Sequence, residues 1–200
     1  DFAAILGAVL FGVTTTELII FVIVVQITNV IGAYVYGLLG EKIGLKNALV
    51  NSLIVMLISV IGMLFVPNKM GYFIVGSLAG CAMAGVQSLD RTLVSVFAPK
   101  NRNAEFYGFF SLAGRTSSIM GPGVMGLAAT GISVWVMNFM VRSEVAVAGD
   151  PAALAVAEKI GHRFAIITLI FFLLVGLMPL LFVNEAEGRR AALESEAEED

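Results

Sequence analysis

The residues best suited to chemistry in this sequence are polar side chains that interrupt long apolar stretches. Gln26 and Asn29 lie three residues apart, and Gln87 and Arg91 lie four apart, so each pair shares one face of a helix. Arg115 lies about ten residues inside a further apolar stretch. Buried polar groups of this kind pair across helices or face a wet cavity. We therefore expect four of them to line a solute cavity, with interhelical hydrogen bonding as the plainer alternative: Gln26, Asn29, Gln87 and Arg115.

A second set of residues carries charges at the edges of the apolar stretches. The set consists of Glu41, Lys42, Asp90, Arg91 and Glu105. All of them fall on one side of a membrane if successive apolar stretches cross it in alternate directions. Opposite charges attract one another more strongly where water is scarce. We therefore expect a cytoplasmic salt-bridge cluster that acts as a gate or brace, and we favour this role over direct contact with a substrate.

Other kinds of site lack the residues that they need. Cys81 and His162 are the single cysteine and histidine of the chain, so we expect neither a disulfide framework nor a metal site. No combination of nucleophile, base and metal ligands occurs, so we expect no catalytic residue, no cofactor and no enzyme activity. The net charge of -3 comes mainly from the C-terminal tail, which gives no reason to expect a nucleic-acid partner.

The composition places these residues in a membrane. Hydrophobic residues make up 58% of the 200 residues and charged residues only 14%, whereas about a quarter of a soluble domain is charged. A membrane helix needs about 20 apolar residues. We predict an all-α integral membrane bundle over residues 1–183, with helices at about 1–13, 17–39, 46–66, 71–94, 105–130 and 163–183. The first is too short to cross, so we expect a truncated first helix in a fragment of a longer protein.

The remaining segments are expected outside the membrane. Residues 131–162 are predicted as a long external loop with a short surface helix at 151–160, begun by Asp150 and Pro151 and ended by Gly161. Within it, residues 132–140 could extend the fifth helix or lie in the membrane interface. Residues 184–200 are predicted as an acidic cytoplasmic tail, a solvated or frayed helical end. The basic residues of the short loops at 40–46 and 95–104 favour that face as the cytoplasmic one.

Small residues mark places where helices can approach closely. The fourth apolar stretch has one at every fourth position, and such a ridge lets two helix backbones approach in lipid. The ridge consists of Gly76, Gly80, Ala84 and Ser88. The loop after the second stretch, GLLGEKIGLK at 37–46, combines charges with glycines that permit a tight reversal of the chain.

Two segments carry a resemblance to a known family. The loop at 37–46 is similar to the major facilitator pattern G-x-L-x-D-R-x-G-x-K-K, which it matches at Gly37, Leu39, Gly44 and Lys46. Residues 85–126 resemble the bacterial branch of that superfamily related to the autophagy-linked vacuolar amino-acid effluxers. The matching residues there include Gln87, Leu89, Arg91, Pro99, Ala104, Glu105, Phe106, Gly108, Phe109, Gly114, Gly121 and Pro122.

This resemblance implies a twelve-helix transporter, of which the chain would be the C-terminal six-helix half, in a bacterial cytoplasmic membrane. Its partners would be the N-terminal half of the same protein, the lipid bilayer, a small solute such as an amino acid, and H+ or Na+ as a coupling ion. Transport would proceed by alternating access about a site near the midplane. A non-transporting membrane scaffold or sensor on the same fold is the alternative.

Overall fold

The computed structural model describes residues 7, 12–66, 68–100, 102–142 and 151–197. Its helices are α2 (Thr15–Ile43), α3 (Leu45–Phe65), α4 (Lys69–Phe97), α5 (Asn103–Arg142), α6 (Pro151–Phe182) and α7 (Glu185–Ala197). Within the described residues, α2 to α6 are long and apolar enough to cross a membrane. The prediction of an all-α integral membrane protein is therefore confirmed, whereas most of the expected first helix at 1–13 lies outside the described residues.

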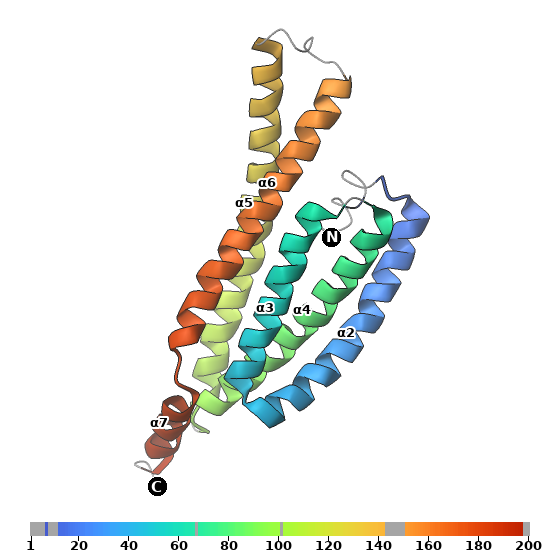
Figure 1. The fold of residues 1–200 in the computed structure, drawn as a ribbon. Helices are drawn as coiled ribbons and strands as arrows, with labels where there is room; N and C mark the ends of the chain where they lie inside the picture. The colour runs from blue at the N-terminus through green and yellow to red at the C-terminus, as the bar shows by residue number, and fades with distance from the viewer. Residues whose placement is uncertain (1–6, 8–11, 67, 101, 143–150, 198–200) are drawn as a thin grey trace.

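The helices form two groups that meet along α3 and α6. In one group, α4 packs against both α2 and α3. In the other, α5 and α6 form an antiparallel pair, and α6 joins this pair to the first group by packing on α3 (Figure 1). The end of α2, the connection from α4 to α5, and α7 all lie at one end of the molecule (Figure 1).

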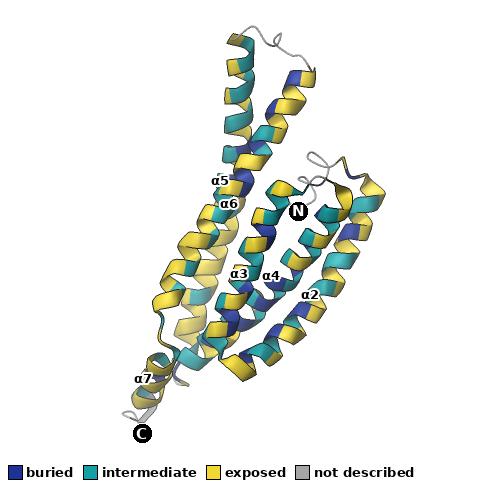
Figure 2. Ribbon diagram, in the orientation of Figure 1, coloured by how far each residue is buried: buried dark blue, intermediate teal, exposed yellow. Residues whose placement is uncertain are grey.

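Small residues explain how α2 and α4 come so close together. A Cβ atom on Gly76 of α4 would lie 2.5 Å from the ring of Phe21, and one on Gly32 of α2 would lie 2.8 Å from Cα of Cys81. The ring of Phe21 stacks on Tyr72, with centroids 4.5 Å apart. The ridge predicted on α4 thus packs against α2, and most buried residues lie on such facing sides of the helices (Figure 2).

The described parts of the segment at 131–162 are helical instead of a loop, and residues 132–140 extend α5, as the alternative interpretation has it. Helix α5 runs to Arg142, and α6 begins at Pro151. The helix that begins at Pro151 does not end at Gly161. That glycine is buried, and a Cβ atom on it would lie 3.1 Å from Cβ of Ser133 on α5. Gly161 therefore serves close packing between two helices instead of a helix end.

The segment after residue 184 is helical and mostly exposed, but it is not detached from the bundle. It forms a separate helix, α7, which packs against α4. Ala192 of this helix is buried, although its charged neighbours remain exposed. A few small and apolar residues are therefore enough to hold one face of this acidic helix against the bundle.

Candidate functional site

A polar groove lies between α2 and α4. Its volume is about 480 Å³, and its lining is Gln26, Asn29, Val30, Ala33, Ala84, Gln87, Ser88 and Arg91. The structure thus brings together three of the four predicted cavity residues. Gln26 and Asn29 share one face of α2 because they are three residues apart, and Gln87 and Arg91 share one face of α4 because they are four apart.

The hydrogen bonds of this groove leave one strong acceptor unused. The side-chain amide of Asn29 donates to Oε1 of Gln26 at 3.0 Å. Oδ1 of Asn29 is buried and has no hydrogen-bond partner among the described residues. A buried acceptor without a donor carries a desolvation cost of about 1–3 kcal/mol. This oxygen lies beside Gly80 of α4, where an added Cβ atom would be 3.4 Å from it, so it faces the contact between the two helices.

Arg115 lines a second groove, which adjoins the first through Arg91. This groove has a volume of about 460 Å³, and its lining is Arg91, Tyr107, Phe110, Ser111, Gly114, Arg115 and Ser118. The described linings of the two grooves contain no carboxylate. Two guanidinium groups on one groove whose lining contains no carboxylate favour an anionic group of a ligand.

The predicted cytoplasmic cluster is spread over several elements in this structure. Oδ1 of Asp90 accepts a hydrogen bond from the backbone N–H of Arg91 at 2.6 Å. Glu105 pairs with Arg102, one turn away on the chain, at 3.3 Å. Glu41 and Lys42 are exposed at the end of α2. Among the described residues no ion pair joins these groups into one cluster, so the gate stays a prediction.

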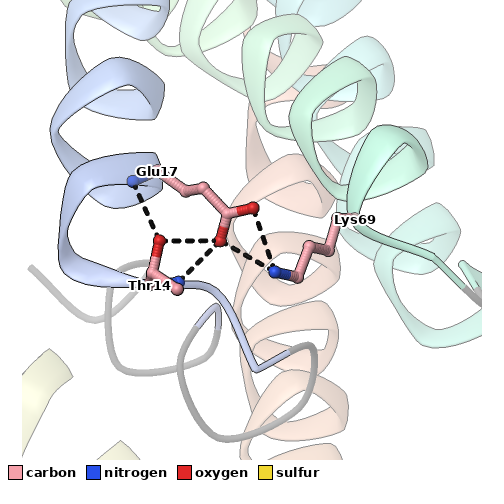
Figure 3. Close-up of polar contacts among 3 residues, drawn as sticks. All are labelled: Thr14, Glu17 and Lys69. Carbon is pink, nitrogen blue, oxygen red and sulfur yellow. Dashed lines mark hydrogen bonds and ion pairs between the residues drawn. The ribbon is translucent and has the colours of Figure 1, made fainter.

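An ion pair between Glu17 and Lys69, which the sequence does not predict, ties α2 to α4 at the opposite end of the molecule (Figure 3). Thr14 and Glu17 form a capping box, in which the backbone N–H of Thr14 donates to Oε2 of Glu17 at 2.7 Å. The ammonium group of Lys69 then donates to both carboxylate oxygens of Glu17, at 2.8 and 3.0 Å. The spacing T-x-x-E predicts the cap, but Lys69 lies 52 residues away.

The comparison with protein families decides where this fold belongs. The family model described as "Vacuole effluxer Atg22 like" matches residues 1–140. The chain belongs to the Atg22-like family. The uncharacterized MFS-type transporter YxiO of Bacillus subtilis is 27% identical over 118 residues, which cover 59% of this chain and 28% of YxiO. Autophagy-related protein 22 of Kluyveromyces lactis is 30% identical over 125 residues, which cover 57% of this chain and 25% of that protein.

The Atg22-like chain therefore spans about a quarter of the length of these curated relatives. No solved structure matches it. The family match includes both grooves, since all of their lining residues precede residue 140. It ends near the end of α5, so α6 and α7 lie beyond it. The predicted resemblance to the major facilitator superfamily and its Atg22 branch is confirmed.

Proposed function

We propose that the protein is a secondary transporter of the major facilitator type that moves a small solute by alternating access. The observation that carries this proposal is the pair of polar grooves on α2, α4 and α5, because these helices are otherwise long and apolar enough to cross a membrane. Intramembrane polar residues that face a cavity are typical of solute pathways. Membership of a family named for an effluxer, and the likeness to an MFS-type transporter, support the same function.

The chemistry of the grooves supports an amino acid as the solute. Its ammonium group could donate to the side-chain oxygen of Gln26 or Gln87, and its carboxylate could accept from Arg91 or Arg115. A solute without an anionic group would leave the guanidinium groups without a partner of opposite charge. We infer that Gln26 and Gln87 orient the polar part of the solute, because both line the groove beside Asn29.

The exposed face of α5 supports a second half of the transporter as partner. Cβ atoms added at Gly114, Gly121 and Gly126 would meet nothing within 4 Å. Small residues of this kind allow another helix to approach closely. We propose that the N-terminal half packs here and closes the grooves, in a bacterial cytoplasmic membrane. Glu41, Lys42, Asp90, Arg91 and Glu105 would then form their gate across the two halves in one state of the cycle. H+ or Na+ would drive the cycle.

Transport by the full-length protein in proteoliposomes tests this function. Uptake of labelled amino acids should be saturable, and Arg115→Ala should raise KM about tenfold or more because a charge-assisted hydrogen bond contributes about 1.5–3 kcal/mol. Arg142→Ala, at the far end of the same helix, is the matched control and should leave KM unchanged. An ion gradient imposed on the vesicles identifies the coupling ion. Folded protein that moves no amino acid, sugar or peptide would favour a scaffold or sensor instead.

A further inference from the structure

The N-terminus of α3 lacks a cap of its own. Gly44 occupies the N-cap position with φ +89°, has no side chain to accept a hydrogen bond, and is followed by no acid in the first turn. The first backbone N–H groups of a helix have no partner within it and attract a negative charge. The missing acceptor comes from α7, because the backbone N–H of Lys46 donates to Oε2 of Glu185 at 3.0 Å.

The C-terminus of α6 shows the converse arrangement. Its last turn contains no basic residue, although cations near the last carbonyl groups of a helix are stabilising. The ammonium group of Lys46 donates to the backbone carbonyl of Leu181 at 2.8 Å. The two charged side chains form no ion pair with each other in the described chain. Instead, Glu185 of α7 caps the N-terminus of α3, and Lys46 of α3 caps the C-terminus of α6.

Local structure holds Glu185 in place for this contact. Oδ1 of Asn184 accepts from the backbone N–H groups of Ala186 and Glu187, at 3.2 and 3.4 Å, and so caps α7. Gly188 lets α7 lie directly on α4, because a Cβ atom there would be 2.7 Å from the ring of Phe97. The first turns of α7 therefore touch the start of α3 and the end of α4, and α7 follows α6 directly along the chain.

This contact has a consequence for the proposed solute site. Arg91 lies on α4 and Arg115 on α5, yet both line one groove. Helix α5 packs mainly on α6, and few of its residues touch α4. The distance between the two guanidinium groups therefore depends on how firmly the α5–α6 pair is attached to the α2–α4 group. That attachment consists of the packing of α6 on α3, the packing of α7 on α4, the few contacts between α5 and α4, and the contacts made by Glu185 and Lys46.

We propose that Glu185 and Lys46 are positioning residues for solute binding. Their double cap, meaning the carboxylate of Glu185 on α3 and the ammonium group of Lys46 on α6, holds the α5–α6 pair in the register that brings Arg115 to Arg91. The effect on solute binding rests on the proposed transport function. The mechanical part of the proposal does not, since it concerns only how two groups of helices are joined.

Hydrogen exchange of the full-length protein tests the contact made by Glu185 separately from the contact made by Lys46. Glu185→Ala should speed exchange in the first turn of α3 about fivefold, the usual effect of losing a helix N-cap. Lys46→Ala should leave that exchange unchanged, because alanine keeps the backbone N–H that Glu185 accepts. Glu187→Ala removes an acid from the same turn of α7 and is the matched control. Equal exchange in Glu185→Ala and Glu187→Ala would overturn the proposal.

Spin-label distances test the attachment of the helix pair. Labels at Ser95 on α4 and Leu174 on α6, with Cys81 replaced by alanine in a cysteine-free background, should give one narrow distance distribution. Glu185→Ala and Lys46→Ala should each broaden it, Lys46→Arg should restore it by keeping a donor, and Glu187→Ala should not change it. If Glu185→Ala does not fold, Glu185→Gln keeps an acceptor without the charge and should broaden the distribution less. Narrow distributions in Lys46→Ala and Glu185→Gln would contradict the double cap.

Transport kinetics connect the contact to the solute. Lys46→Ala and Glu185→Ala should raise KM for the transported amino acid severalfold, and Lys46→Arg should restore it, whereas a merely stabilising contact would lower the amount of folded protein at constant KM. Unchanged KM in folded Lys46→Ala would overturn the positioning role. Absence of transport by the unmodified protein would instead refute the proposed function, and the exchange and distance measurements would still decide whether the double cap exists.

Discussion

Replacement of Gly32 by alanine should push α2 away from α4. The added Cβ atom would lie 2.8 Å from Cα of Cys81, so it meets backbone and cannot be relieved by rotating a side chain. The helices would have to separate by more than about 0.6 Å, the difference between that distance and the 3.4 Å at which ordinary contact begins, because the carbonyl oxygen of Cys81 lies closer still. Overpacking of this kind costs about 1–3 kcal/mol.

Gly62→Ala is the matched control for this substitution. Gly62 also lies inside a membrane helix next to α4, but its added Cβ atom would sit 3.7 Å from the methyl groups of Val75, which is ordinary contact. The gain of helix propensity, about 0.5–1 kcal/mol, should make this variant neutral or slightly more stable. The two variants therefore have the same chemical change and opposite expected signs.

Thermal unfolding of the purified full-length protein measures the difference. We expect Gly32→Ala to lower Tm by about 2–4 °C for each kcal/mol in a domain of this size. Alkylation of Cys81, which is half-buried beside Gly32, should become faster as the helices separate. If Gly32→Ala matched Gly62→Ala in Tm and in the alkylation rate of Cys81, the close packing of α2 on α4 would be refuted.

Two further predictions concern contacts that join the helices. Ser52→Ala should lower the stability by about 0.6–1 kcal/mol in thermal unfolding, because the buried Oγ of Ser52 donates to the carbonyl of Ala82 on α4 at 2.6 Å. Ser77→Ala is the control and should have a smaller effect, because the hydrogen bond of Ser77 stays within one helix. Lys69→Met should lower Tm at low ionic strength but not in 1 M salt, since Lys69 and Glu17 are exposed and salt screens such pairs. An equal decrease of Tm at both salt concentrations would contradict this prediction.

The helices could be predicted because about 20 apolar residues in a row have few alternatives to a membrane helix. The sharing of one groove wall by Gln26 and Asn29 follows from helical spacing alone. The position of Gln87 opposite these two residues cannot be predicted from spacing, because it depends on the register of α4 against α2. Gly76 and its neighbours predicted close packing on α4, but no local pattern says which helix supplies Phe21.

Errors arose where one residue type serves two purposes. Gly161 follows a short helical segment and reads as a helix stop, whereas its contact with Ser133 makes it a packing glycine inside a longer helix. Glu185 begins an acidic segment and reads as solvated, but its carboxylate accepts from an amide 139 residues away. Such assignments depend on tertiary contacts, and the sequence near each residue favours the simpler interpretation.

The α5–α6 pair has a practical consequence for imaging. With 40 and 32 residues, these helices are about 60 and 48 Å long, whereas the hydrocarbon core of a membrane is about 30 Å thick. Their far ends extend beyond those of α2, α3 and α4 (Figure 1). Ala153, Ala157 and Gly161 keep the pair tightly joined along this extension. In electron cryomicroscopy, a helical hairpin outside the detergent belt would provide an asymmetric feature for aligning particles of a small membrane protein.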